Sequence, residues 1–381
     1  MHVFNLISRL ALFTAVSVIA SQTTYGQFDT TAAKRDLSIV DLGTLPGYAD
    51  SYPVDLNDRG EVVGFSYRDG AQHAFLWRRG RIIDLGTLGG FYSQPTAINN
   101  RGQVAGWAAN ERGEQRPFLW ENGTMIDLGG AGFSFEIDAM NDHGQVVGTD
   151  HSHALLWEFG RQIELPGFGP ELRSEAFDIN NRGDVVGFGL DAAGQAHAVM
   201  WQNGRLIDLG VPGVALRINE RRQVIGFYTN AAGKAQAFFW DRGHMTDVGP
   251  LGGGTGWWPG SVVWGVNEHG QVVGFGDTDT DSTHAFVWKR GDLIDISLPD
   301  VTMSLGWAIN NRGEVVGDLY RNDLGARAFI WAGGVTSDLG VLPGGASTTA
   351  ARINERGEVL GVGNNAAGQT RAVLWTRREA K

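Results

Sequence analysis

The residues of this chain that are best suited to bind a ligand lie in two neighbouring segments of its second half. Trp257 and Trp258 stand in a glycine-rich segment, and exposed tryptophan rings can stack on sugars or on aromatic groups. Asp277, Asp279 and Asp281 alternate with other residues, as the first ligands of a calcium-binding loop do. We predict that these five residues bind the ligand. Calcium is the one candidate cofactor, and no metal site is assigned elsewhere.

Both assignments have structural alternatives. The two tryptophans could instead fold back and cover a junction within the fold. In the acidic segment, Ser282 replaces the glycine and Trp288 replaces the closing glutamate of a helix–loop–helix calcium site. That type of calcium site is excluded, and a looser loop site remains open.

Common catalytic signatures do not occur in the sequence. The chain contains no cysteine, no HExxH and no GxSxG pattern, so thiol, metalloprotease and serine hydrolase mechanisms lack their usual residues. The segment GNNAAGQT resembles a phosphate-binding loop, but Gln369 stands where that loop requires lysine. No catalytic residue is assigned.

The candidate binding residues belong to a chain built from repeats, of which INNRGQVAGW at Ile98 is one copy. Eight copies occur, at spacings between 39 and 48 residues. Periods of roughly 40 to 45 residues with several short strands are typical of propeller blades. The first Asn of each copy is Asn57, Asn99, Asn141, Asn180, Asn219, Asn267, Asn310 or Asn354.

Each repeat predicts four strands joined by three hairpins, as in TAIN, QVAGWA, RPFLW and TMIDLG. The Asn and the Gly three residues later favour a type I turn followed by a left-handed glycine, so we interpret them as turn residues and not as ligands. In the fifth repeat Arg222 replaces this glycine, which predicts a strained or altered turn.

Acidic residues recur where the fourth strands end. They could form a ring of carboxylates that binds cations, but capping of the turn beyond each strand is the simpler interpretation. The residues are Asp84, Asp127, Asp208, Asp247 and Asp338, with Glu164 and Asp295 as looser versions.

The two ends of the repeated region complete one another. The last repeat stops after its third strand, RAVLW, whereas LSIVDLG at Leu37 is a fourth strand with no preceding three. Pairing the two removes exposed sheet edges. The predicted fold is therefore an all-β, eight-bladed β-propeller of four-stranded blades over residues 37–381, closed by the N-terminal strand. An open superhelical array is the alternative.

Charged residues occur two positions before the Asn in four repeats, where the other repeats have small residues. They are Asp55, Asp178, Arg217 and Arg352. Neighbouring repeats place Asp178 beside Arg217, and only a closed ring places Asp55 beside Arg352. We expect mutual neutralisation of these charges; an ion-selecting channel is the alternative.

The first 26 residues predict a signal peptide and a short segment after it. An apolar run from Leu10 to Ala20 follows Arg9 and is too short to span a bilayer. Cleavage is expected after Ala20 or near Gly26, which predicts a secreted or periplasmic protein with no membrane span. A buried N-terminal strand or helix is the alternative.

Composition narrows the range of partners. A formal net charge of −11 and scattered Lys and Arg residues argue against nucleic acid as a partner. Without cysteine the chain has no disulfide, so its stability must come from packing. We expect a monomer.

The motifs HAFLW at His73, DLGTLGG at Asp84 and INNRGEVVG at Ile309 together resemble the HAF family of extracellular repeat proteins. The resemblance covers Asp36 to the C-terminus. Gln or Arg replaces the His of this motif in four repeats. The resemblance implies an extracytoplasmic location and brings no catalytic residues with it.

The predicted function follows from loop variation. Loops between second and third strands and between blades share one rim and vary, which is where recognition is usually built. We predict an exported binding or scaffold protein that recognises a glycan, peptide or surface partner through this rim. The binding site is expected at blade six, the repeat that contains Asn267 and the five candidate residues named above. A glycan-active hydrolase or lyase using acidic residues on the rim is the alternative, and two carboxylates converging in a cleft would favour it. A purely structural envelope repeat is a third possibility.

Overall fold

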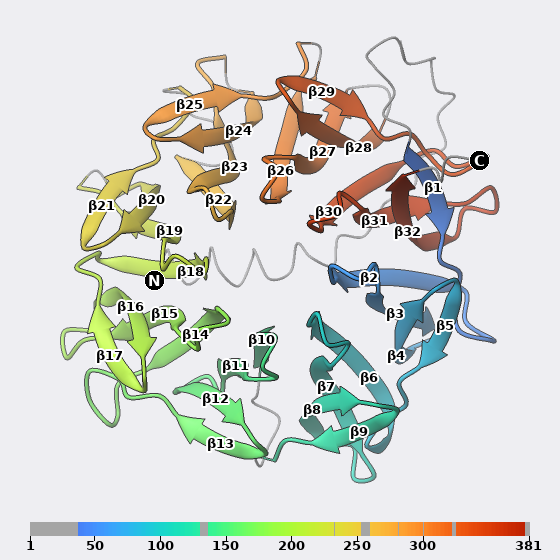
Figure 1. Ribbon diagram of the computed structural model, residues 1–381, viewed down its shortest axis with the longest axis horizontal. Helices are drawn as coiled ribbons and strands as arrows, with labels where there is room; N and C mark the ends of the chain where they lie inside the picture. Colours follow the sequence, from blue (N-terminus) through green and yellow to red (C-terminus); the bar gives the residue numbers. More distant parts are fainter. Residues whose placement is uncertain are drawn as a thin grey trace.

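The repeats form separate β-sheets around a common axis. The computed structural model describes residues 37–129, 136–231, 233–252, 260–280, 282–299, 301–321 and 325–377, and the regular elements of these residues are all β-strands. Figure 1 shows the sheets side by side around the axis, in the order of the chain. This arrangement is a β-propeller.

None of the described residues belongs to a helix of the length and hydropathy that a membrane crossing needs.

Each repeat forms a unit of four antiparallel strands, and the first strand of each unit lies nearest the axis (Figure 1). The first strands are β2 (Asp50–Leu56), β6 (Gly89–Ile98), β10 (Glu136–Met140), β14 (Ser174–Ile179), β18 (Gly213–Ile218), β22 (Ser261–Val266), β26 (Met303–Ile309) and β30 (Thr348–Ile353). The second strands are β3 (Val62–Arg68), β7 (Val104–Asn110), β11 (Val146–Thr149), β15 (Val185–Leu190), β19 (Val224–Thr229), β23 (Gln271–Asp277), β27 (Val315–Arg321) and β31 (Val359–Asn364).

The third and fourth strands complete the units toward the outer edge. The third strands are β4 (Ala71–Arg78), β8 (Gln115–Glu121), β12 (Ala154–Glu158), β16 (Ala196–Gln202), β20 (Ala235–Asp241), β24 (Thr283–Lys289), β28 (Gly325–Ala332) and β32 (Thr370–Arg377). The fourth strands are β5 (Arg81–Asp84), β9 (Thr124–Asp127), β13 (Arg161–Glu164), β17 (Arg205–Asp208), β21 (His244–Asp247), β25 (Asp292–Asp295), β29 (Val335–Asp338) and β1 (Leu37–Asp41).

The N-terminal strand supplies the outer strand of the last unit, as the sequence predicts. Strand β1 pairs antiparallel with β32, from Leu37 opposite Arg377 to Asp41 opposite Val373. The resulting sheet has the order β1, β32, β31, β30. Elsewhere two pairs of units are joined into eight-stranded sheets by a single parallel bridge each, between β4 and β6 and between β24 and β26.

The core lies between the faces of neighbouring units. The tryptophan near the end of the third strand is buried there in six of the eight units. Trp375 donates its indole N–H to the carbonyl oxygen of Leu339 in the preceding unit at 2.9 Å. Trp201 donates in the same way to Pro166 at 2.8 Å. The third strands are apolar on both faces because each face packs on a different unit.

Each second strand also contains a glycine, and the reason that glycine is needed there differs from the reason in the turn. All eight first strands contain a β-bulge three residues before the Asn, as between Ala176 and Asp178 in β14. The bulge brings a carbonyl oxygen close to the second strand. A Cβ atom on Gly187 would lie 1.9 Å from the oxygen of Glu175, so only glycine fits there.

The first hairpin confirms the interpretation of Asn and Gly as turn residues. The side-chain oxygen of Asn57 accepts hydrogen bonds from the backbone N–H groups of Arg59 and Glu61, both at 3.0 Å, and Gly60 has a φ of +76°. The prediction for Arg222 is also confirmed, because this residue keeps the turn at a φ of +64°, where a side chain is strained.

Five of the seven acidic residues predicted at the fourth-strand ends cap turns: Asp84, Asp127, Asp208, Asp295 and Asp338. Asp84 accepts a hydrogen bond from the N–H of Gly86 at 2.8 Å and also pairs with His73 of the HAFLW motif at 3.1 Å. Arg116 pairs in the same way with Asp127 in the next unit. In six repeats the His or Arg of this motif pairs with the strand-ending carboxylate, whereas His153 pairs with Asp150.

Candidate functional site

The five residues predicted to bind a ligand are only partly described. Trp257, Trp258 and Asp281 lie outside the described residues. Asp279 is exposed, and a Cβ atom on Gly252 would lie 2.4 Å from its backbone nitrogen. The loop before β22 and the loop after β23 are therefore in contact, as the sequence predicts.

Asp277 does not lie on the surface. Its side chain is 1% exposed at the end of β23, and one carboxylate oxygen accepts a hydrogen bond from the Thr283 hydroxyl at 3.0 Å. Residue 277 is still paired with β24, so the strand extends into the acidic segment and directs this side chain inward. Among the described residues there is no group of three or more His, Asp or Glu side chains that could hold a metal ion.

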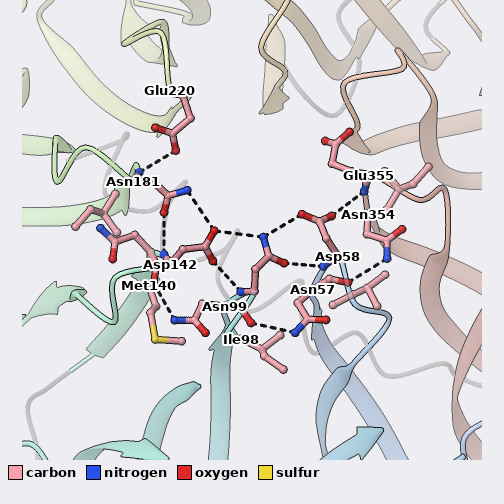
Figure 2. Close-up of a pocket in the computed structure, with 15 residues that line it drawn as sticks. Asn57, Asp58, Ile98, Asn99, Met140, Asp142, Asn181, Glu220, Asn354 and Glu355 are labelled. Carbon is pink, nitrogen blue, oxygen red and sulfur yellow. Dashed lines mark hydrogen bonds between the residues drawn. The ribbon is translucent and has the colours of Figure 1, made fainter. Parts of the chain in front are cut away.

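A pocket opens on the propeller axis, at the rim that carries the first and third hairpins. Figure 2 shows the residues that line it. The pocket has a volume of about 270 Å³ and is lined by the hairpin residues that follow the first strands. Its polar lining consists of Asn57, Asp58, Asn99, Asn100, Asn141, Asp142, Asn181, Glu220, Asn354 and Glu355.

The repeated Asn residues form a ring of hydrogen bonds at the base of the axial pocket. Each donates its side-chain N–H to the backbone carbonyl oxygen of the Asn in the next repeat, as from Asn57 to Asn99 at 3.0 Å. The same amide donates to an acid or amide four residues later in its own turn, as from Asn57 to Glu61 at 2.7 Å. The bond between repeats is present at all eight positions, at 2.8 to 3.2 Å.

The residues directly after these Asn residues form a second ring, which we call the inner polar ring. Each accepts, through its side-chain oxygen, the backbone N–H of the equivalent residue in the preceding repeat (Figure 2). The distances lie between 2.7 and 3.1 Å. The ring consists of Asp58, Asn100, Asp142, Asn181, Glu220, Glu268, Asn311 and Glu355.

The inner polar ring is rich in hydrogen-bond acceptors. Five of its eight members are carboxylates, which carry further lone pairs and no donor at neutral pH. Burial raises the pKa of Glu355, and the negative charges of Asp58 and Glu268 raise it further. A ligand that donates hydrogen bonds or carries positive charge therefore matches this ring.

Charged side chains also occur on the first strands, two residues before the Asn. Arg352 and Asp55 form an ion pair at 3.6 Å, which confirms the predicted contact between the first and last repeats. Asp178 accepts a hydrogen bond from the N–H of Ile218 in the next repeat at 2.9 Å, and the charge of Arg217 opposes the rise that burial causes in its pKa. Opposite charges thus neutralise one another across repeats.

Asp138 belongs to the same charged group, and the sequence analysis did not identify it. It occupies the bulge of β10, one position before the residue that is charged in other repeats. Burial raises its pKa well above the ordinary value, and the nearby carboxylates of Glu136 and Glu175 raise it further.

The inner polar ring was also missed by sequence reasoning. Its members follow the Asn that we interpreted as a turn residue, and all eight are Asp, Asn or Glu. A turn needs no such restriction at that position, so the restriction was the signal that could have identified the ring.

Comparison with known proteins shows distant structural likeness and no sequence family. No family model matches the chain, and no curated protein matches it. The β-propeller domain of the Trilobed protease from Pyrococcus furiosus is 10% identical, with a TM-score of 0.47, over 87% of this chain and 97% of that one.

Two further solved structures, a peptidase and a lectin, are also similar to this chain. Dipeptidyl peptidase 4 from Porphyromonas gingivalis is 8% identical, with a TM-score of 0.57, over 88% of this chain, and the chain spans 58% of the length of that peptidase. The BP39L lectin from Burkholderia pseudomallei is 11% identical, with a TM-score of 0.40, over 92% of this chain and 98% of that one. At such identity the likeness to the peptidase shows the fold alone.

Proposed function

We propose that the chain is an exported propeller of HAF-type repeats in which the eight repeats form eight blades of a closed ring. The pairing of β1 with β32 supports closure. The ion pair between Asp55 and Arg352 and the hydrogen bond from Asn354 to Asn57 both join the first repeat to the last. The apolar run before Ala20 supports export.

The function of the ring is to bind a ligand. The observation that supports this proposal is the axial pocket, which is rich in hydrogen-bond acceptors. A pocket of about 270 Å³ holds one or two sugar-sized groups. Its carboxylate and amide oxygens accept hydrogen bonds from hydroxyl groups and attract ammonium groups. The ligand is therefore a hydroxyl-rich glycan end or one that carries an amino group. The contacting loops at residues 252 and 279 lie on the opposite rim, where a second contact with a glycan or peptide remains part of the proposal.

A glycan-cleaving enzyme is the second candidate, and one observation favours it. The carboxyl group of Glu355 has a raised pKa, and the backbone N–H of the same residue donates to the carboxylate of Asp58 at 2.9 Å. Glycosidases pair a protonated carboxylic acid with an ionised carboxylate. Against this role, both oxygens of Glu355 accept the N–H of Asn311 at 3.1 Å, which is a structural use of the group.

Binding of glycan fragments to the mature protein tests the proposal. Glu220→Gln together with Glu268→Gln removes two charges from the inner polar ring and keeps the oxygens that accept the neighbouring N–H groups. We expect amino-bearing fragments to bind the parent and to bind this variant about 30-fold more weakly, since each of the two charged hydrogen bonds contributes about 1 kcal/mol more than a neutral one. Asp69→Asn with Glu111→Gln, on the opposite rim, is the control and leaves binding unchanged.

The outcomes separate the two candidates. New reducing ends that disappear in a Glu355→Gln variant would establish the enzyme. Equal binding by the parent and by the Glu220 and Glu268 variant would exclude the axial pocket as the site.

A further inference from the structure

The rim that carries the axial pocket also carries a wide set of exposed basic side chains. In every repeat the residue two positions after the Asn is Arg or His, and all eight are exposed. They are Arg59, Arg101, His143, Arg182, Arg221, His269, Arg312 and Arg356. None of them lines the axial pocket.

The third hairpins add basic residues to the same rim. Successive strands are antiparallel, so the hairpin between the third and fourth strands emerges at the same end as the first hairpin. Its exposed basic residues include Arg79, Arg81, Arg161, Arg205, Arg242 and Arg290. The hairpins lie near the outer edge of the propeller (Figure 1), so basic groups surround the pocket at two radii.

Several of these hairpin residues occupy a position that turn geometry does not favour for them. The first residue of each two-residue loop has a left-handed backbone, which suits Asn or Gly. Asn122 and Asn203 fill it in two repeats. Arg79, Arg242 and Arg290 fill it in three others, at φ values between +50° and +53°. Strained residues are often kept for what they contact rather than for the fold.

Phe159 is the residue least explained by the fold. It occupies the same left-handed position at a φ of +48°, and its side chain is 92% exposed. A bulky aromatic residue in this conformation is unfavourable for the turn and leaves an apolar ring in water. An aromatic side chain among basic residues is typical of a surface that rests on a lipid bilayer.

Carboxylates on this rim gather at the inner polar ring near the axis, and a second set of carboxylates lies on the other rim. The carboxylates that end the fourth strands lie there, since those strands run away from the third hairpins. They are Asp84, Asp127, Asp208, Asp247, Asp295 and Asp338. A net charge of −11 therefore does not prevent the basic rim from facing an anionic surface, because this second set then faces away from it.

We propose that the rim of first and third hairpins docks on a bilayer that contains anionic phospholipids, with the arginines contacting phosphate groups and Phe159 entering the headgroup region. Basic groups distributed around a whole rim match a flat anionic surface better than a single polymer chain in a groove. The proposal goes beyond glycan binding. Because the axial pocket opens on the same rim, docking would cover it, but the vesicle test below needs no glycan.

Vesicle binding by the mature chain, which begins after the predicted cleavage site, tests this inference. We expect binding to vesicles of phosphatidylglycerol and phosphatidylethanolamine, weakening with salt, and no binding to phosphatidylcholine vesicles. Replacing Arg79, Arg242 and Arg290 together by Asn installs the residue that Asn122 and Asn203 already provide. This variant should be at least as stable as the parent and bind vesicles on the order of 100-fold more weakly, since each basic residue contributes about fivefold.

Two further variants make the test specific. Phe159→Asn also relieves the turn, and we expect it to weaken vesicle binding several-fold without lowering the melting temperature. Arg68, Arg112 and Lys234 changed together to Asn remove the same charge from the opposite rim and should leave vesicle binding intact. The proposal is overturned if the parent ignores anionic vesicles, if it binds only a soluble polyanion such as heparin, or if the rim variants bind vesicles as the parent does. Loss of glycan binding alone would not affect it.

Discussion

The side-chain amide of Asn354 donates a hydrogen bond to the backbone carbonyl oxygen of Asn57 at 3.0 Å, although 297 residues separate the two in the chain. It is the same bond that Asn57 makes to Asn99 and that every other repeat makes to the next. Each Asn thus stabilises its own turn and also holds the neighbouring repeat. Of these eight bonds, the one from Asn354 joins the last repeat to the first, which supports the closed ring proposed above.

This relationship predicts that Asn354→Ala is more destabilising than loss of a turn Asn that makes no bond between repeats. The change leaves the N–H groups of Arg356 and Glu358 and the carbonyl oxygen of Asn57 without this partner in a buried site, at a cost of roughly 3 kcal/mol. Asn365→Ala is the matched control, because Asn365 makes the same local turn bonds and is more exposed. We expect it to cost about 1 kcal/mol. Equal unfolding free energies for the two variants in urea would contradict a role in joining repeats.

Removal of the N-terminal strand should destabilise the protein and promote association. A chain that begins at residue 44 loses β1 and exposes the edge of β32. It also loses the buried side chain of Leu42 and the packing of Leu37 and Ile39. This apolar loss corresponds to roughly 4 kcal/mol and to a fall of about 5 °C in melting temperature. The control begins at residue 37. An unchanged melting temperature and an unchanged monomer by light scattering would argue against closure.

Replacement of the strained Arg222 by Gly should change stability in opposite directions in the parent protein and in an Asp184→Asn variant. Its guanidinium pairs with the buried carboxylate of Asp184 at 2.8 Å, so Arg222→Gly relieves the backbone but leaves that charge without the pair. We expect a net loss of about 1 kcal/mol in the parent. In an Asp184→Asn background the same change should stabilise by about 1 kcal/mol, because only the strain remains. Thermal unfolding of the four proteins measures the difference, and an equal effect of Arg222→Gly in both backgrounds would show that the ion pair contributes nothing.

Asp318 predicts a pH dependence of stability. Burial raises its pKa to about 7, although it accepts hydrogen bonds from the Trp307 indole at 2.7 Å and from the N–H of Ala350 at 2.9 Å. The folded protein therefore holds a proton that the unfolded chain releases near pH 4. This contribution to stability is complete below pH 4 and is lost as the pH rises through 7, by roughly 4 kcal/mol at most.

Comparison with Asp318→Asn isolates this contribution. Asn does not titrate, so the parent's stability advantage over the variant should be largest near pH 4 and smallest above pH 7. Urea unfolding across this range measures it. A constant difference between the two proteins would show that Asp318 is already ionised in the folded state.

The sequence alone determined the repeat unit and its local bonding. The Asn and Gly of the first hairpin, the strand-ending carboxylates and the strain at Arg222 all depend on residues within a few positions of one another, so the pattern predicts them. The division of one repeat between the chain ends predicted the pairing of Leu37 with β32, since an unpaired strand and an incomplete sheet have one way to satisfy each other.

The tertiary structure decided which side chains meet. Asp58 and Asn100 are 42 residues apart and come together only because equivalent turns converge on one axis, a relation that no single turn contains. Asp277 was expected beside Asp279 on the surface, but the register of β23 with β24 buries it. The rim on which Arg79 and Phe159 stand, opposite the acidic strand ends, likewise follows from strand direction within the assembled sheets. Local bonds are set by neighbours in sequence, whereas rings, pockets and charged faces are set by how the repeats rotate about a common axis.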